Sequence, residues 1–166
     1  MNHRDFIELL KQQTSTLDYE YSLKFSILIC KKLYFDYKRF TEVENWGNAD
    51  LPMDAINFCQ KVLQSPIESI NAKILLTEVE LITPDTEDFG SELGSYALNA
   101  SAAVYETLRF ILDRDTTHIY NIATYFTDTI DFKIQEQKEL NEIEIEKHPA
   151  IIEAWNFVID QTKNGA

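Results

Sequence analysis

Residues 84–108, PDTEDFGSELGSYALNASAAVYETL, join an acidic segment directly to a run of small and apolar residues. From Leu93 onward the apolar residues recur every three or four positions, as they do on the buried face of a helix. The small residues in this run allow neighbouring helices to approach closely. The stretch therefore predicts a helix in the centre of the core, with an acidic loop before it. The residues expected to face inward are Tyr96, Ala97, Ala100, Val104, Leu108 and Ile111, and the small residues are Ala97, Ala100, Ser101 and Ala103.

Helical spacing of apolar residues continues through most of the chain. Residues 119–126, IYNIATYF, are rich in β-branched and aromatic residues and could form a strand by themselves, but helical spacing on both sides favours a helix. Glycine and proline number only four each, too few for the many turns of a sandwich or barrel. We therefore predict an all-α fold, a single compact domain of about six to eight helices over residues 1–166. The helices are expected over residues 5–13, 19–40, 50–64, 67–82, 93–111, 115–137 and 148–162.

The acidic segment also carries signals for a loop and a helix start. Gly90 is expected to adopt a backbone conformation closed to other residues, and Ser91 or Asp88 is expected to cap the central helix. In the helix that precedes the segment, the residues expected to be buried are Ile70, Ile74, Leu75 and Val79. On this interpretation the segment has a purely structural role.

The charge of the chain restricts the partners that it can bind. The formal net charge is −13, from 28 acidic against 15 basic residues. Binding to nucleic acid is therefore not expected, because affinity for phosphate backbones comes mainly from Lys and Arg. The same charge attracts basic proteins and speeds encounter with them, although it also serves solubility alone.

Cys30 and Cys59 are the only cysteines, and their spacing matches no metal or redox motif. Both lie in apolar stretches, so buried free thiols in a reducing compartment are expected. The N-terminal residues lack the apolar core of a signal peptide, and no segment has the roughly 18 apolar residues that span a bilayer. The sequence therefore predicts a cytoplasmic protein that does not bind membranes.

No motif indicates a metal, a cofactor or catalysis. The carboxylates of the acidic segment lack the spacing of an EF-hand loop, and the chain has no Glu-x-x-His pair of the kind that binds two iron ions in helical bundles. Asp115 and His118 form one isolated Asp-x-x-His pair. None of the histidines belongs to a nucleophile and base pattern, and no glycine-rich phosphate loop is present. We therefore predict a protein that is not an enzyme and has no metal or cofactor.

The acidic segment can also form a docking surface together with a second acidic strip on a later helix, which consists of Asp128, Asp131, Glu136 and Glu139. Carboxylates pair with Lys and Arg, and tyrosine is a frequent anchor residue in interfaces. A solvated acidic face has the same periodicity, so the pattern does not separate the two interpretations. The residues predicted to bind a partner are Asp85, Glu87, Asp88, Tyr96, Asn99, Asp128 and Asp131.

The order of motifs resembles the YjaG-like bacterial proteins, a family of a domain of unknown function. The resemblance is carried by LYFDYKRFTEVENWGN (33–48), by the acidic segment with its following helix (84–108), and by LNEIEIEKHPAIIEAWNFVID (140–160). It implies an all-helical fold and no established catalytic residue, and some relatives look like immunity proteins encoded beside secreted antibacterial toxins, nucleases among them. Relatives often carry Asp where this chain has Asn99, which weakens a metal or catalytic role.

The resulting hypothesis is a non-catalytic immunity protein that neutralises a basic toxin, for example a nuclease, by direct binding. The alternative is a housekeeping helical protein with a small-molecule or metal site between helices near Asn99 and the acidic segment. These hypotheses differ in the kind of partner, a basic protein or a small ligand.

Overall fold

The structure is a computed structural model that describes residues 1–65 and 69–163. These residues form eight α-helices and one short 3-10 helix, and they contain no strand. The all-α prediction is therefore confirmed, and residues 119–126 are helical. The first two residues of the helix predicted over 67–82 lie outside the described residues. The elements are α1 (His3–Thr16), α2 (Tyr19–Glu44), α3 (Asp50–Gln64), α4 (Ser69–Leu81), η1 (Thr86–Asp88), α5 (Leu93–Asp113), α6 (Thr117–Gln137), α7 (Glu142–Glu146) and α8 (Pro149–Lys163).

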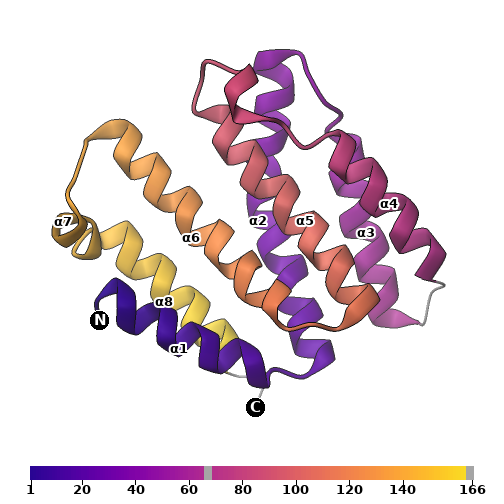
Figure 1. Ribbon diagram of the computed structural model, residues 1–166, viewed down its shortest axis with the longest axis horizontal. Helices are drawn as coiled ribbons and strands as arrows, with labels where there is room; N and C mark the ends of the chain where they lie inside the picture. The colour runs from indigo at the N-terminus through magenta and orange to yellow at the C-terminus, as the bar shows by residue number, and fades with distance from the viewer. Residues whose placement is uncertain (66–68, 164–166) are drawn as a thin grey trace.

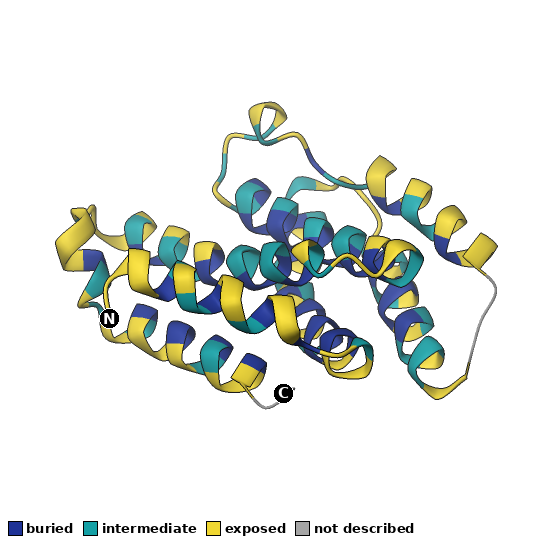
Figure 2. Cartoon of the chain, turned by 60° about the horizontal axis from the view of Figure 1, so that its bottom comes forward, coloured by how far each residue is buried: buried dark blue, intermediate teal, exposed yellow. Residues whose placement is uncertain are grey.

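Helix α5 occupies the centre of the fold and contacts α2, α3, α4 and α6 (Figure 1). Helices α3 and α4 lie on one side of it, whereas α1 and α8 lie side by side beyond α6. The buried faces of the helices point toward one another, and the exposed faces point outward (Figure 2). One continuous apolar core results, with residues from all eight α-helices.

The sequence of α5 explains its central position. Ala97, Ala100 and Ala103 are at most 3% exposed, so the backbone of α5 can approach its neighbours closely. Larger residues on the same stripe, Val104 and Leu108, fill the remaining space and are buried as predicted. The inward face predicted from the sequence is confirmed for these residues.

Helix ends are fixed by side chains at several positions. Asn2 and Asp18 cap α1 and α2, each accepting a hydrogen bond from a backbone N–H in the first turn. After α2 the chain turns through Gly47, which has a φ of +83°. A side chain there would also place its Cβ 2.5 Å from the hydroxyl oxygen of Tyr37. That hydroxyl donates to the carbonyl oxygen of Ile82 at 2.6 Å, so it connects α2 to the end of α4.

Two predictions about the start of α5 are wrong. Gly90 does not have a positive φ, and a Cβ added there would meet no atom within 4 Å. The residue preceding α5 is Glu92, which makes no side-chain capping hydrogen bond. Ser91 instead donates its hydroxyl proton to Glu44 at 2.7 Å, so it connects the loop to α2 rather than capping α5.

The prediction that Ile70 and Ile74 are buried is also wrong. They are 55% and 52% exposed, whereas Val79 is fully buried as predicted and Leu75 is half-buried. Ala72, which was not among the predicted residues, is fully buried on the side of α4 opposite Ile70. Apolar residues occur on both faces of this helix, so their spacing does not select the face. Close packing against α5 brings the face with the small residue Ala72 inward.

Cys30 and Cys59 are both buried and free, as predicted. Cys30 Sγ lies 3.3 Å from the hydroxyl oxygen of Thr107. Burial raises the pKa of the Cys30 thiol to about 12, so it remains protonated and unreactive at neutral pH. Both cysteines therefore behave as small core residues.

The junction between α5 and α6 holds a histidine between two carboxylates. His118 Nδ1 hydrogen-bonds Glu106, and Nε2 lies 2.9 Å from Asp113 Oδ2. Carboxylates only accept, so both ring nitrogens donate when the imidazole is protonated. Burial lowers the pKa of His118, but the hydrogen bonds with Asp113 and Glu106 outweigh burial, and the net effect raises this pKa above 6.5.

A raised pKa in the folded state predicts a pH dependence of stability. The contribution of His118 is fully present below pH 6.5 and is lost as the pH rises through the raised folded pKa. We therefore expect the free energy of unfolding, measured in urea, to fall across this interval in the wild type and to fall less in His118→Gln. NMR titration of the His118 ring should give a midpoint above 6.5 that decreases in Asp113→Asn. A midpoint below 6.5 in the wild type would contradict the assignment.

Candidate functional site

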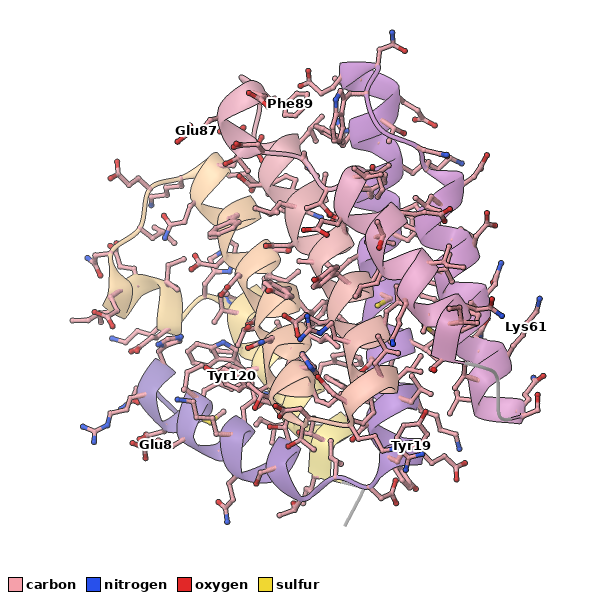
Figure 3. The ribbon with its side chains drawn as sticks, turned by 45° about the vertical axis from the view of Figure 1, so that its right-hand side comes forward. Glu8, Tyr19, Lys61, Glu87, Phe89 and Tyr120 are labelled. Carbon is pink, nitrogen blue, oxygen red and sulfur yellow. The ribbon has the colours of Figure 1, made fainter. Side chains whose placement is uncertain are left out.

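The residues 85–92, here called the acidic loop, connect α4 to α5 and contain η1. The Asp85 side chain accepts a hydrogen bond from the backbone N–H of Glu87 at 3.0 Å and so caps η1. Asp85, Glu87 and Asp88 are all exposed. Figure 3 shows Glu87 pointing away from the helices, whereas Phe89 points toward α2. The loop therefore presents its carboxylates to solvent and its aromatic residue to the core.

An aromatic cluster fixes the acidic loop to the end of α2. The ring of Phe89 lies 4.8 Å from that of Phe40 and 5.5 Å from that of Trp46, measured between ring centroids and in edge-on geometry. Phe40 is fully buried, and Pro84, directly before the loop, is buried as well. Edge-on aromatic pairs add a specific geometry to the burial of apolar area. The carboxylates of the loop are therefore held at a defined place.

A polar network lies beside the acidic loop and connects α2, α5 and α6. Tyr96 donates its hydroxyl proton to Glu136, and Lys133 Nζ lies 5.3 Å from the centre of the Tyr96 ring. Lys133 also donates to both carboxylate oxygens of Asp36, at 2.8 and 2.9 Å. Burial, reinforced by the hydrogen bond with Glu136, raises the pKa of Tyr96. The Tyr96 hydroxyl is thus a hydrogen-bond donor at neutral pH.

Apolar side chains are exposed among these polar groups. Trp46 is 37% exposed beside Phe89, and Phe132 is 43% exposed on α6. A groove of about 300 Å³ separates the start of α5 from the end of α6. Carboxylates and an exposed aromatic ring share this groove, whose lining residues are Glu92, Ser95, Phe132, Gln135 and Glu136.

The structure separates the seven predicted partner-binding residues into three environments. Asp85, Glu87 and Asp88 lie together on the acidic loop. The expectation that Tyr96 and Asn99 lie on a docking surface is wrong, because they are only 3% and 7% exposed. Asn99 donates to the hydroxyl oxygen of Thr129 at 3.1 Å and so connects α5 to α6 inside the fold.

Asp128 and Asp131 form the third environment, on α6 and away from the acidic loop. They line a pocket of about 270 Å³ that is open to solvent and whose other walls are the N-terminus of α1, α7 and the start of α8. Asp128 is an exposed residue, and partial desolvation of its carboxylate, followed by the charge of Asp131, raises its pKa. The second acidic strip predicted from the sequence is therefore not one surface, because Glu136 lies in the groove near α5 instead.

Sequence reasoning did not select Trp46 or Phe132. For Phe132 the available signal was an aromatic residue off the apolar stripe of its helix, since it lies between the inward residues Ile130 and Ile134 in the sequence. Trp46 lies in the turn between α2 and α3, where helical periodicity gives no signal. Among residues 1–65 and 69–163, no three His, Cys, Asp or Glu side chains are arranged to hold a metal ion. None of the helices in this part of the chain is both long enough and apolar enough to cross a bilayer.

These features define an acidic, all-helical protein whose candidate sites are lined by carboxylates. The chain belongs to the family described as "Protein of unknown function (DUF416)", which matches residues 9–162. The fold is similar to that of a crystal structure of a DUF416 family protein from Shewanella baltica OS155, with a TM-score of 0.81 and 19% identity. That similarity covers 92% of this chain and 83% of the other.

The chain is also similar to a protein from Komagataella phaffii (strain GS115 / ATCC 20864), the MICOS complex subunit MIC60. The two are 29% identical over 118 residues. The match covers 64% of this chain but only 23% of the MICOS subunit, so this chain corresponds to less than a quarter of that protein.

Proposed function

We propose that this protein binds a basic protein through the acidic loop and the adjoining groove, and that it acts as an immunity protein for a toxin rather than as an enzyme. We also propose that the protein belongs with the YjaG-like proteins and that it is cytoplasmic. The two buried free thiols support a cytoplasmic location, because cysteines stay reduced in the cytosol. The observation that carries the proposal is that Asp85, Glu87 and Asp88 are exposed and form no ion pair with the described residues. The loop that holds them is anchored by Phe89 beside the exposed ring of Trp46.

Charge complementarity supports a basic partner. Within the described residues, none of the ion pairs includes Asp85, Glu87 or Asp88, so these carboxylates are available to Lys and Arg of another protein. A net charge of −13 adds long-range attraction. For a nuclease, the Lys and Arg that hold phosphates would pair with this surface instead, and inhibition would follow from the same contacts.

Trp46 and Phe132 provide the apolar part of such an interface. Aromatic anchors in desolvated positions carry much of the binding energy, whereas exposed charges mainly speed association and select the partner. The anchoring of the loop by Phe89 also limits the ordering cost of binding, because the surface is formed before the partner arrives.

The experiment is a co-purification of the tagged protein with the product of the adjacent reading frame, followed by measurement of association and of toxin activity. A stoichiometric complex that inhibits the toxin would support the proposal. A partner that remains fully active in the complex would contradict the immunity role, and a failure to bind at low salt would contradict this partner.

Reversal of the loop charges is expected to slow association. Because two Lys replace two carboxylates, Glu87→Lys with Asp88→Lys should lower the association rate constant about tenfold or more at low ionic strength and flatten its dependence on salt. Surface plasmon resonance over a salt series measures both effects. The matched control is Glu153→Lys with Asp160→Lys, the same change of charge at exposed positions on α8. Equal slowing in both pairs would show that net charge alone acts and would remove the acidic loop as the docking surface.

A further inference from the structure

Helix α4 is apolar on two opposite sides. Ala72 and Val79 are fully buried on the side that packs against the rest of the fold. Ile70, Ile74 and Leu81 lie on the other side, and each of them is more than half exposed. A helix that is apolar around its circumference is typical of the interior of a protein, but α4 lies at the edge of this molecule with its outer side exposed (Figure 2). The outer side of α4 is therefore apolar without lying inside the fold.

This outer side has the residue spacing of a helix–helix interface. Ile70, Ile74, Thr77 and Leu81 follow one another at intervals of four, three and four residues, and all four are exposed. Intervals that alternate in this way repeat every seven residues and place the side chains on one seam, as in a coiled coil. These four residues, here called the outer stripe, are suited to packing against a second helix with the same spacing.

Charged residues lie along both edges of the outer stripe. Lys73 and Glu80, seven positions apart, lie along one edge, whereas Asn71 and Glu78 lie along the other. All four residues are exposed. Within the described residues, none of the ion pairs includes Lys73, Glu78 or Glu80. The charges on these edges are therefore available to another molecule.

The two edges are complementary to those of a second, antiparallel copy of α4. When two identical helices pack antiparallel around a two-fold axis, the same edge of each helix meets its counterpart. Lys73 of one copy then lies beside Glu80 of the other, and the symmetry forms this pair twice. On the opposite edge, Glu78 lies beside the uncharged Asn71. The apolar contacts in the same alignment are Ile70 with Leu81, and Ile74 with Thr77.

A parallel pair of α4 helices is less favourable than an antiparallel pair. The acidic loop follows the C-terminal end of α4, so a parallel pair would bring the acidic loops of the two copies together. Like charges at close range repel each other. An antiparallel pair keeps the two loops at opposite ends and also aligns the helix dipoles favourably.

We propose that the outer stripe of α4 binds a second copy of this chain, with the two α4 helices antiparallel around a two-fold axis. Helix α4 has 13 residues and is about 20 Å long, so one pair of these helices forms a small interface. Such an interface is typical of weak association, and we expect a dissociation constant of about 10–100 µM. The inference concerns self-association alone and does not rest on the proposed toxin binding.

The test is sedimentation velocity of the full chain, without any toxin, from about 1 to about 500 µM. The average mass is expected to rise from that of a monomer toward that of a dimer. Glu80→Lys should weaken this association about tenfold or more, because it places two Lys side chains together at each of the two symmetric contacts. The same change makes the net charge of −13 less negative, which by itself favours association. A weaker dimer would therefore report the contact and not the net charge.

Exchange of the two charges identifies the antiparallel contact. Lys73→Glu alone should also weaken the dimer, whereas Lys73→Glu with Glu80→Lys restores both pairs and should return the dissociation constant to within about threefold of the wild type. Glu78→Lys is the matched control, because it makes the same change of charge on the same helix but lies beside Asn71. It should change the dissociation constant by less than about threefold.

The variants are expected to fold, because the three substituted side chains are exposed, and circular dichroism would verify this. A wild-type chain that remains monomeric at every concentration would overturn the proposal. The same conclusion would follow if the charge exchange did not restore the dimer, or if Glu78→Lys weakened it as much as Glu80→Lys.

Discussion

Phe40→Ala is expected to lower the free energy of unfolding by about 3–5 kcal/mol, the range measured for buried Phe to Ala substitutions in protein cores. Phe40 is fully buried, and its ring lies against those of Tyr37, Trp46 and Phe89. The substitution removes the ring around which these three pack and leaves a cavity that the surrounding helices can fill only in part. Urea denaturation followed by circular dichroism measures the loss.

Phe35→Ala is the matched control, since it removes the same side chain from the same helix. Phe35 is 70% exposed, so its loss is expected to cost less than about 0.5 kcal/mol. Trp46 fluorescence gives a second measurement, because Trp46 contacts Phe40 directly and should change its emission in Phe40→Ala alone. Similar losses of stability in the two variants would mean that the aromatic cluster does not anchor the acidic loop as described.

This aromatic cluster illustrates what sequence could and could not predict. The helical class and the buried stripes of α5 and α8 follow from periodicity, because each stripe repeats over several turns. The contact between Phe40 and Phe89 joins residues 49 positions apart in the sequence, and no local pattern encodes it. The acidic loop was therefore visible as a charge cluster, whereas its anchoring was not.

Tyr96 shows how two sequence signals can compete. Its position on the inward stripe of α5 indicated burial, and its amphipathic side chain indicated an interface anchor. The structure buries it and uses its hydroxyl to bind Glu136 on α6. Periodicity was the better guide here, because the position of a side chain on a helix is fixed by the backbone, whereas a hydroxyl group can be satisfied inside the fold.

Ile70 and Ile74 show the limit of the same argument. Helix α4 has apolar residues on most of its circumference, so periodicity selected Val79 correctly but also assigned Ile70 and Ile74 to the buried face. The pair Asp128 and Asp131 shows a different limit. Their adjacency on one helix was predictable, but the open pocket beside them depends on α1, α7 and α8, which come from distant parts of the chain.

Ala103→Leu tests the inference that small residues set the position of α5. Ala103 is fully buried in the core cluster, so three additional carbon atoms have no free space. Overpacking of this kind typically costs about 1–3 kcal/mol, because side chains leave their preferred rotamers or the helices separate. The change should be measured as a lower urea midpoint with an unchanged slope.

Ala102→Leu places the same side chain on the same helix one position earlier, where the residue is partly exposed. Ala and Leu have nearly equal helix propensity, so the control should change stability by less than about 0.5 kcal/mol. A difference in stability between the two variants therefore reports the close packing of helices at Ala103. It does not report a change in the helix propensity of α5. If Ala103→Leu were as stable as Ala102→Leu, the core beside α5 would have room for larger residues. The small residues of the stretch 84–108 would then not determine how closely α5 packs against its neighbours.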